Sequence, residues 1–585
     1  MTTGLAAHAH VPPRRNAARG RTSPRTGGGR WQLPAAGRWI VVALLLVIGV
    51  AGPLSACERT AEESEQFIRL GLDGIITLDP AKVQDASSAF YITHLFSGLV
   101  RLDEEFEVVP DLAERWEVSP DGRVYTFELR QNATFHNGRL IRAEDIKYSL
   151  ERAADPDTAS PVAATYLGDI VGVREKLQGT ANEIVGVRVR GDYTIEITID
   201  QPKAYFLAKL TYPTAYVVDR ENVEASPDWA NSPNGSGPFM LSEWQPDELL
   251  VLARNDQYYG EKAQLQEVQF LGGLPEVPAY EQGILDIAYV GLNYVERLSD
   301  PSQPLHEEQQ VSPDLSVFYL GLNPNVKPFD DMKIRQAFNH ALDREKLVNV
   351  TLRGMAVPAR GILPPELPGH NEHVQGLEFD AGLARQLLSQ SSYQDVQNLP
   401  PVVLHTPGRG AQPARHITAI IEMYRQNLGV EVKIRQTDFA SFLTLLTERP
   451  EEVQLFSLGW IADYADPQNF LDVLFHSESN ENNSRYANAE VDRMLLDART
   501  EQDRATRLRL YQEIEQRIVT DAAWVPLWHG KEFRLVKPYV RGYRPALVVQ
   551  PWLNRISIVG TPEGRVEWPP EQPPVFPPTP PAVAA

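Results

Sequence analysis

Residues 453–471 contain, in direct succession, a strand pattern, a turn and the start of a helix. Residues 453–458 are mostly apolar and have the length of a strand. Asp466 and Pro467 form a typical helix start, because the carboxylate caps the first turn and the proline needs no N–H partner there. The turn between them carries two carboxylates, an indole and a phenol. This order predicts an open α/β domain, in which loops at the carboxyl ends of strands bind ligands.

A regular α/β pattern surrounds this segment from about residue 320 onward. Apolar residues at helical spacing predict a helix at 334–342 and another at 417–428, which Gly429 stops at the position that helices favour for glycine. The other predicted elements are a strand at 430–434, a short helix at 438–446, and amphipathic helices at 489–500 and 503–519. The run 524–528 is expected to return the chain to an earlier lobe.

The earlier part of the chain predicts one mixed lobe. Its expected strands are 67–70 and 124–130, its expected helices 91–99 and 143–153, and its expected hairpin 185–199 turns at Gly191-Asp192. The Gly-rich run 234–239 lacks the spacing and the lysine of a phosphate-binding loop, so we interpret it as a tight turn between lobes.

Composition restricts the class of protein. A chain of 585 residues is too long for one core and should divide into at least two or three domains. Its composition, with 43% apolar and 23% charged residues, is typical of globular proteins. Residues 1–56 contain seven of the 56 bases and none of the 77 acids, which leaves a net charge of −28 on the rest. Such an acidic body is a poor candidate for binding nucleic acid.

The single cysteine, Cys57, follows an Arg-flanked apolar stretch at 39–56 that is too short for a comfortable membrane span. This pattern predicts that residues 1–56 are a secretory signal. Leu54-Ser55-Ala56-Cys57 resembles the bacterial lipobox, whose cysteine is lipidated and anchors the protein to a membrane. The alternative is an ordinary signal cleaved nearby, which leaves a free thiol. One cysteine excludes intramolecular disulfides and multi-cysteine metal sites.

Both ends of the mature chain have the composition of unstructured segments. Residues 57–66 are polar and acidic and are expected to form a lipidated tether. Residues 567–585 are too rich in proline to join a core, so we expect a disordered tail.

Several ordered blocks together resemble solute-binding protein family 5, the peptide-binding components of ABC importers, and above all its oligopeptide-permease branch. Besides the lipobox and Gly459–Pro467, these blocks are Leu78-Asp79-Pro80, Leu95-Phe96-Ser97-Gly98-Leu99, Pro110-Asp111-Leu112-Ala113-Glu114-Arg115-Trp116, Tyr125-Thr126-Phe127-Glu128-Leu129-Arg130, Ala154-Asp155-Pro156-Asp157-Thr158-Ala159-Ser160-Pro161, Gly235-Ser236-Gly237-Pro238-Phe239 and Ile334-Arg335-Gln336-Ala337. The resemblance extends from about residue 67 to residue 560.

The resemblance implies a periplasmic-binding-protein-like α/β fold, a two-lobed clam shell with three domains. Domain I would comprise 58–96, 229–322 and 535–566, domain II 97–228, and domain III 323–534. The implied function is capture of peptides between the lobes and their delivery to the permease subunits of an ABC transporter. The implied protein is an extracytoplasmic monomer that needs no cofactor and is not an enzyme.

The resemblance also implies a set of ligand-binding residues. Asp463 would pair with the α-amine of a peptide, because a carboxylate in a closed, low-dielectric cleft gains a charge-assisted bond to an ammonium group. The main chain of Gly459 and Ile461 would pair with the extended peptide, and Gln84-Asp85-Ala86 would face it.

Each of these residues has a structural alternative. Asp463 can instead cap a turn, and Trp460 and Tyr464 can belong to the core or form an aromatic wall against the peptide. We interpret Asp466 as a helix cap. The spacing of Asp463, Asp466 and Asp472 lacks the pattern of a calcium-binding loop. His370 and His373 are only a weak candidate for metal binding, so no metal site is expected.

The chain departs from the pattern of some family members at three places near the expected cleft. Val162 stands where some relatives have tyrosine, Phe439 where some have tryptophan, and Ser457 where an arginine can neutralise a peptide carboxylate. Other members of the family bind nickel complexes, haem or oligosaccharides, so a non-peptide solute is an open alternative. A secreted hydrolase is a further alternative, but its usual motifs are absent.

Overall fold

The computed structural model describes residues 66–410, 412–544, 553–560 and 562–566, together with 568, 574 and 576. The predicted signal at 1–56, Cys57 and most of the predicted tether and tail therefore lie outside the described residues. Among the described residues, no helix combines the length and apolar character needed to cross a bilayer.

The first sheet joins the start of the described chain to its middle. Strand β1 (Phe67–Gly71) pairs in parallel with β10 (Glu267–Leu271), and β9 (Leu249–Arg254) and β8 (Phe239–Gln245) complete the order β1-β10-β9-β8. Helix α1 (Ala86–Leu95) begins with Asp85 as its N-cap and buries Tyr91, Ile92 and Leu95. The hairpin β2 (Val100–Leu102) and β3 (Val108–Pro110) follows it.

A second sheet of order β4-β5-β7-β6 lies within residues 113–198. Its apolar face shares one core with helix α2: Phe127 of β5, Ile195 of β7 and Ile146 of α2 are fully buried there. The elements of this part are β4 (Ala113–Val118), β5 (Val124–Leu129), α2 (Ala143–Ala153), α3 (Ala163–Leu167), α4 (Val173–Leu177), β6 (Val187–Gly191), β7 (Thr194–Thr198), α5 (Phe206–Lys209) and α6 (Arg220–Ala225).

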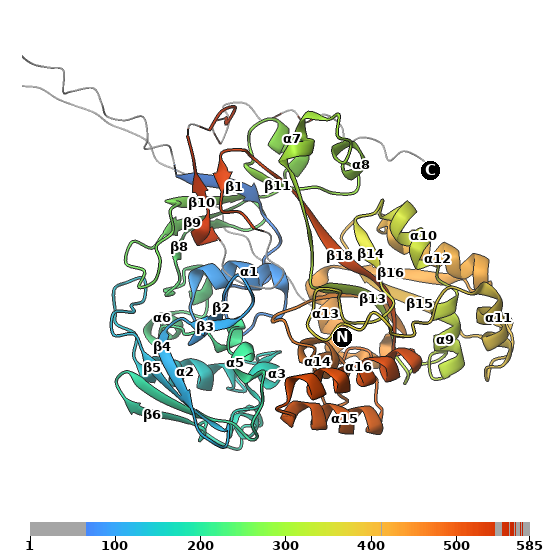
Figure 1. Ribbon diagram of the computed structural model, residues 1–585, viewed down its shortest axis with the longest axis horizontal. Coiled ribbons are helices and arrows are strands. Elements are labelled where there is room, and N and C mark those ends of the chain that lie inside the picture. The colour runs from blue at the N-terminus through green and yellow to red at the C-terminus, as the bar shows by residue number, and fades with distance from the viewer. Residues whose placement is uncertain are drawn as a thin grey trace, which may run out of the picture. The chain divides into compact units, whose positions relative to one another are not determined.

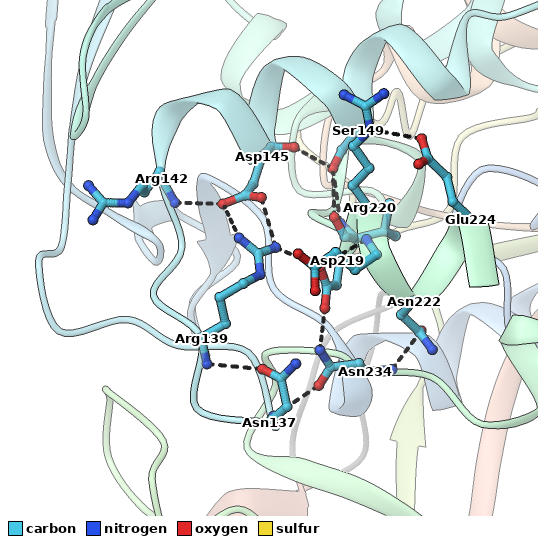
Figure 2. A network of polar contacts seen from close by, with 12 residues as sticks. Asn137, Arg139, Arg142, Asp145, Ser149, Asp219, Arg220, Asn222, Glu224 and Asn234 are labelled. Carbon is cyan, nitrogen blue, oxygen red and sulfur yellow. Dashed lines mark hydrogen bonds and ion pairs between the residues drawn. The ribbon is translucent and has the colours of Figure 1, made fainter.

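A polar network fixes the Gly-rich turn at 234–239 against this second part (Figure 2). The Asn234 amide donates to Asp219 at 2.5 Å, and its oxygen accepts the backbone N–H of Asn137 at 2.9 Å. Arg139 bridges Asp219 at 2.6 Å and Asp145 at 2.9 Å, and Asp145 also accepts the backbone N–H of Arg142 at the start of α2. The turn thus has a structural role, as its sequence predicts.

The largest sheet has eight strands, with the path β11-β18-β13-β17-β15-β16 and two further strands, β12 and β14, paired to β18. In Figure 1, β18 (Trp524–Val536) runs from β11 to β13 and so connects two regions of the molecule. The other members are β11 (Ile287–Tyr289), β12 (Gln309–Pro313), β13 (Ser316–Leu322), β14 (Ala356–Pro358), β15 (Val402–Pro407), β16 (Val432–Thr437) and β17 (Leu455–Ile461).

Two groups of helices pack beside this sheet (Figure 1). In the first group α9 (Met332–His340), α11 (Ala381–Ser389) and α12 (Arg415–Leu428) share a core with β13 and β15. In the second, α14 (Gln468–Phe475), α15 (Ala489–Thr500) and α16 (Arg504–Thr520) bury apolar faces together. The remaining elements are α7 (Glu276–Glu281), α8 (Val295–Leu298), α10 (Arg344–Lys346), α13 (Phe439–Glu448), β19 (Val540–Arg541) and β20 (Ser557–Ile558).

The elements agree with the sequence pattern where caps and periodicity are strong. Helices α2 and α15 have the predicted bounds, and Gly429 ends α12 with a φ of +75°. The helix predicted at 91–99 lies earlier in the chain, since α1 begins at Ala86 and ends at Leu95. The predicted turn after residue 458 begins later, because β17 continues to Ile461 through its pairing with β13.

The predicted division into three domains stays a prediction. β13 lies in segment 229–322, which was assigned to domain I, yet it pairs along its length with β17 of segment 323–534. The strands themselves therefore connect the two predicted lobes.

Candidate functional site

A cavity of about 510 Å³ is lined by residues from both ends of the described chain. One wall comes from α1 and the end of β1, and the opposite wall from β13, β17 and β18. Its apolar and aromatic lining residues include Ala86, Phe90, Tyr91, Phe318, Ile461 and Trp528. A cavity of this size, mainly apolar with a few polar groups, is typical of a small-molecule or peptide site.

Strand β17 presents a free edge beside this cavity. Residues Ser316–Leu322 of β13 pair with all of β17, but on the other edge β15 pairs only with Leu455 and Phe456. Beyond Phe456, no strand in the described part of the chain pairs with this second edge. Gly459 and Ile461 lie in that part of β17, and Ile461 lines the cavity. An extended peptide can add to such an edge through main-chain hydrogen bonds.

Gly459 permits close packing at this point of the sheet. It pairs with Phe318, and a Cβ at position 459 would lie 2.9 Å from the Phe318 ring. Phe318 in turn stacks on Trp528 at a centroid distance of 5.1 Å, and both rings line the cavity. These two residues therefore supply the aromatic wall that the sequence suggested for Trp460 and Tyr464.

Asp463 lies two residues beyond β17 and is buried, with 7% of its surface exposed. The Tyr166 hydroxyl and the Asn469 amide both donate to its Oδ2, the latter at 2.9 Å. Asn469 also accepts the backbone N–H of Asp463 at 3.0 Å, so one side chain fixes both ends of this residue. Among the described residues, no lysine, arginine or histidine pairs with the carboxylate.

Burial raises the pKa of Asp463 to about 6, and the hydrogen bonds from Tyr166 and Asn469 partly oppose this shift. Ionising a buried carboxylate without a nearby cation is costly, because burial removes the water that stabilises its charge and no opposite charge replaces that water. An ammonium group beside Asp463 would restore the charged form. The site is therefore suited to a cationic ligand group and unsuited to an anion.

Tyr166 is the contact that sequence reasoning missed. It lies in α3, 297 residues before Asp463, and its ring stacks on Tyr212 with a centroid distance of 3.9 Å. Its hydrogen bond connects residues of the predicted domains II and III, and neither Tyr166 nor Asp463 is among the residues that line the cavity. The short block after Pro161 contains this tyrosine, but no local pattern indicates its partner.

The two aromatic residues of the loop, Trp460 and Tyr464, stabilise its conformation through hydrogen bonds. The Trp460 indole donates to Asn469 at 3.2 Å, and Trp460 is not among the cavity-lining residues. Tyr464 is fully buried and its hydroxyl donates to Gln468. In this arrangement both residues hold the loop, and contact with a ligand stays a prediction for them.

The neighbouring carboxylates have partners of their own. Asp466 accepts the backbone N–H of Gln468 at 3.0 Å, as expected of a cap, and forms a two-pronged ion pair with Arg507. Asp472 forms a similar pair with Arg499. In the described part of the chain, no group of three or more His, Cys, Asp or Glu side chains is arranged to hold a metal ion.

The segment Gln84-Asp85-Ala86 leads into α1. Gln84 is partly buried, Asp85 is buried and caps the helix, and Ala86 lines the cavity. Ala86 and Ile461 therefore line the same cavity, and contact of this segment with a ligand stays a prediction.

Val162 and Phe439 do not line the cavity. Val162 is 2% exposed and belongs to the core beside Tyr166, and Phe439 is 39% exposed at the start of α13. The charged residues that line the cavity are Asp73, Asp314 and, from β18, Lys531, Glu532 and Arg534. Arg534 pairs with Glu532 at 2.6 Å. No local sequence pattern indicates that this strand reaches the cavity.

The fold and this cavity define a two-lobed binding protein, and the comparisons agree. A family model described as "Bacterial extracellular solute-binding proteins, family 5 Middle" matches residues 107–482. The chain therefore belongs to the bacterial extracellular solute-binding proteins of family 5. The predicted family and the clam-shell class of fold are both confirmed. The family is a substrate-binding transport type rather than an enzyme class, and its members lie outside the cytoplasm.

Two curated relatives cover most of the chain. The periplasmic oligopeptide-binding protein OppA of Salmonella typhimurium is 30% identical, over 86% of this chain and 95% of its own length. The probable deoxycholate-binding periplasmic protein YgiS of Escherichia coli is also 30% identical, over 80% of this chain and 88% of its own.

Two solved structures of one protein bear on the arrangement of the lobes. The Escherichia coli murein tripeptide binding protein MppA superposes with a TM-score of 0.77 at 28% identity, over 86% of this chain and 99% of that one. The unliganded open form of the same protein gives a TM-score of 0.62, over 84% and 97%. The lower score for the open form agrees with the Tyr166–Asp463 contact between the predicted domains II and III.

Proposed function

We propose that this protein captures peptides between its lobes and delivers them to the permease of an ABC transporter. The observation that carries the proposal is Asp463, a buried carboxylate without a cation at the end of an unpaired strand edge. The carboxylate would bind the peptide α-ammonium, and the edge of β17 at Gly459 and Ile461 would bind the peptide main chain. Relatives named for oligopeptide binding support the assignment.

Calorimetric titration with short peptides tests the ligand class. After unfolding and refolding to remove retained ligand, the protein should bind free peptides but not their N-acetylated forms. Asp463→Asn should weaken binding about 10- to 100-fold, since a hydrogen bond to a charged group contributes about 1.5–3 kcal/mol. Asp228→Asn, at an exposed position outside the site, is the matched control and should leave binding unchanged.

One result would contradict the role of Asp463, and another would contradict the peptide assignment. Equal binding of acetylated and free peptides would show that Asp463 does not bind the amine. Binding of deoxycholate but of no peptide would place the protein beside YgiS in ligand class. A turnover assay with labelled peptides addresses the hydrolase alternative, because cleavage would contradict a binding function.

We also propose that Cys57 carries a lipid anchor and that the protein acts as a monomer. The lipobox-like sequence before Cys57 supports the anchor. Cys57→Ser should abolish incorporation of labelled palmitate and release the protein from the membrane fraction. Continued labelling of this variant would contradict the proposal.

A further inference from the structure

A second, smaller pocket shares no lining residue with the cavity described above. Its volume is about 110 Å³, and most of its lining residues are polar. One side comes from helices α3, α4 and α5, and the other from α14, the loop after it and α15. These two groups of helices belong to the predicted domains II and III, and α3 lies next to α14 in Figure 1. The volume is enough for a few water molecules or one small oxyanion.

His476 brings a hydrogen-bond donor without a partner to this pocket. The residue follows α14, is 5% exposed and lines the pocket. Its Nδ1 accepts the backbone N–H of Glu478 at 3.2 Å, so the neutral imidazole carries its proton on Nε2. Nε2 is buried, and no hydrogen-bond partner for it is found among the described residues. Because buried donors are almost always satisfied in folded proteins, this N–H indicates an acceptor that enters the pocket from solvent.

Arg174 contributes a positive charge from the other side of the pocket. It lies exposed in α4, and its Nε donates to the Gly168 carbonyl at the long distance of 3.4 Å. Within the part of the chain that the structure describes, no carboxylate lies within ion-pair distance of its guanidinium. A guanidinium is always charged, and its planar N–H groups match the oxygens of a carboxylate or phosphate.

The buried carboxylates that line the pocket already have counter-charges. Asp472 pairs with Arg499 at 2.8 Å, and Asp169 pairs with Lys209 at 2.8 Å. Glu478 also lines the pocket, but it is exposed, so solvent and salt screen its charge. The donors without partners therefore decide what can enter, and they favour an anion.

We propose that this pocket binds a small inorganic oxyanion, such as phosphate or sulphate, between Arg174 and the Nε2–H of His476. One donor comes from each of the predicted domains II and III. An oxyanion supplies the acceptor that His476 needs and the negative charge that Arg174 needs, and such charge-assisted hydrogen bonds are the strong ones. The anion would therefore connect the two predicted domains at a second place, apart from the ligand cavity.

The same two groups of helices carry the contact between Tyr166 and Asp463. Tyr166 lies in α3, and Asn469, which donates to Asp463, lies in α14. An anion that holds these helices together should favour the closed arrangement and so strengthen peptide binding. The anion site does not depend on what the cavity binds, whereas its effect on affinity rests on the proposed function.

Calorimetric titration with sodium phosphate at constant ionic strength tests the site without any peptide. The wild type should bind one phosphate. Arg174→Gln should weaken this binding about 10- to 100-fold, the range expected for loss of a hydrogen bond between charged groups, and Arg174→Lys should restore part of it. His476→Phe, which keeps a ring but lacks the N–H, is a second variant and should also weaken binding.

Arg188→Gln is the matched control. Arg188 is also exposed in the predicted domain II, and its Nε also donates to a backbone carbonyl, that of Val185 at 3.3 Å. It does not line the pocket, so this variant should bind phosphate as the wild type does.

Peptide titrations with and without saturating phosphate test the coupling, with chloride at equal ionic strength as the reference. Phosphate should raise the affinity for peptide about 5-fold or more, and peptide should raise the affinity for phosphate by the same factor. Arg174→Gln should lose this increase, and Arg188→Gln should keep it.

The possible failures can be told apart. If neither phosphate nor sulphate binds, or if Arg174→Gln binds phosphate as tightly as the wild type, the pocket holds water only and the anion site is wrong. If phosphate binds but leaves the affinity for peptide unchanged, the coupling is wrong. If phosphate binds and no peptide does, the proposed function is wrong and the anion site stands.

Discussion

At the residue scale, the hydrogen bond from Tyr166 influences how much of Asp463 is ionised near neutral pH. The pKa of Asp463 is raised to about 6 by burial, and the Tyr166 hydroxyl lowers it toward its ordinary value. An ammonium ligand needs the ionised form. Affinity for a peptide should therefore be full above about pH 7 and fall as the pH drops through about 6.

Tyr166→Phe should move this midpoint upward. The ring and its stacking on Tyr212 remain, while the donor to Asp463 is lost, so the pKa of Asp463 should rise further. We expect about 3- to 10-fold weaker binding at pH 7, in line with loss of one hydrogen bond, and a midpoint at higher pH. Calorimetric titrations from pH 5 to 8 measure both effects.

Tyr424→Phe is the control for this variant. Tyr424 is also fully buried, but it lies in the core of α9 and α12, away from the cavity. Loss of the Tyr424 hydroxyl should leave the pH profile of binding unchanged. A Tyr166→Phe protein with the wild-type profile would show that this hydroxyl does not control Asp463.

At the element scale, the helices and helix ends that depend on a local sequence pattern could be predicted from the sequence. Helix α15 follows from amphipathic spacing and the cap at Asn488, and the end of α12 follows from Gly429. The extension of β17 to Ile461 depends on β13, more than a hundred residues earlier, and on hydrogen bonds that no local pattern shows. Asp463 could be identified from its motif, whereas Tyr166 reaches it only through tertiary structure.

Helix α5 is fixed by a buried group of charges that the sequence did not reveal. The Asp169 carboxylate accepts from Lys203 at 2.5 Å and from Lys209 at 2.8 Å, and all three side chains are at least nine-tenths buried. Although burial acts to raise the pKa of Asp169, the two lysines lower it to about 2. This shift contributes about 2 kcal/mol of stability, present above about pH 4 and lost as the pH falls through about 2.

Asp169→Asn should lower the free energy of unfolding at pH 7 by about 3–5 kcal/mol, because it leaves two buried lysines without their counter-charge. Denaturant unfolding at pH 7 and pH 2 measures this, and the difference from wild type should shrink at the lower pH. Asp200→Asn is the control: Asp200 pairs with the same Lys203 but is half exposed, so its loss should cost less than about 1 kcal/mol. An equal effect of both variants would contradict a special role for Asp169.

At the scale of the whole molecule, the two predicted lobes are connected in two different ways. β18 is a permanent connection, since one strand pairs with β11 and β12 near its end and with β13 near its start. The contact of Tyr166 with Asp463 is a side-chain hydrogen bond that can open without disturbing a strand. A permanent strand and a reversible contact are the parts of a hinge.

Closure should therefore respond to peptide, and paired labels can detect it. With Cys57→Ser as background, Val185→Cys and Leu496→Cys place labels at exposed positions on either side of the contact. Saturating peptide should shorten the distance between these labels, and Asp463→Asn should require more peptide for the same change. Labels at Met332→Cys and Leu496→Cys, both within segment 323–534, should keep their distance. An unchanged first distance at saturation would mean that the lobes are already closed without ligand, and binding would then have to proceed through local opening of the Tyr166–Asp463 contact.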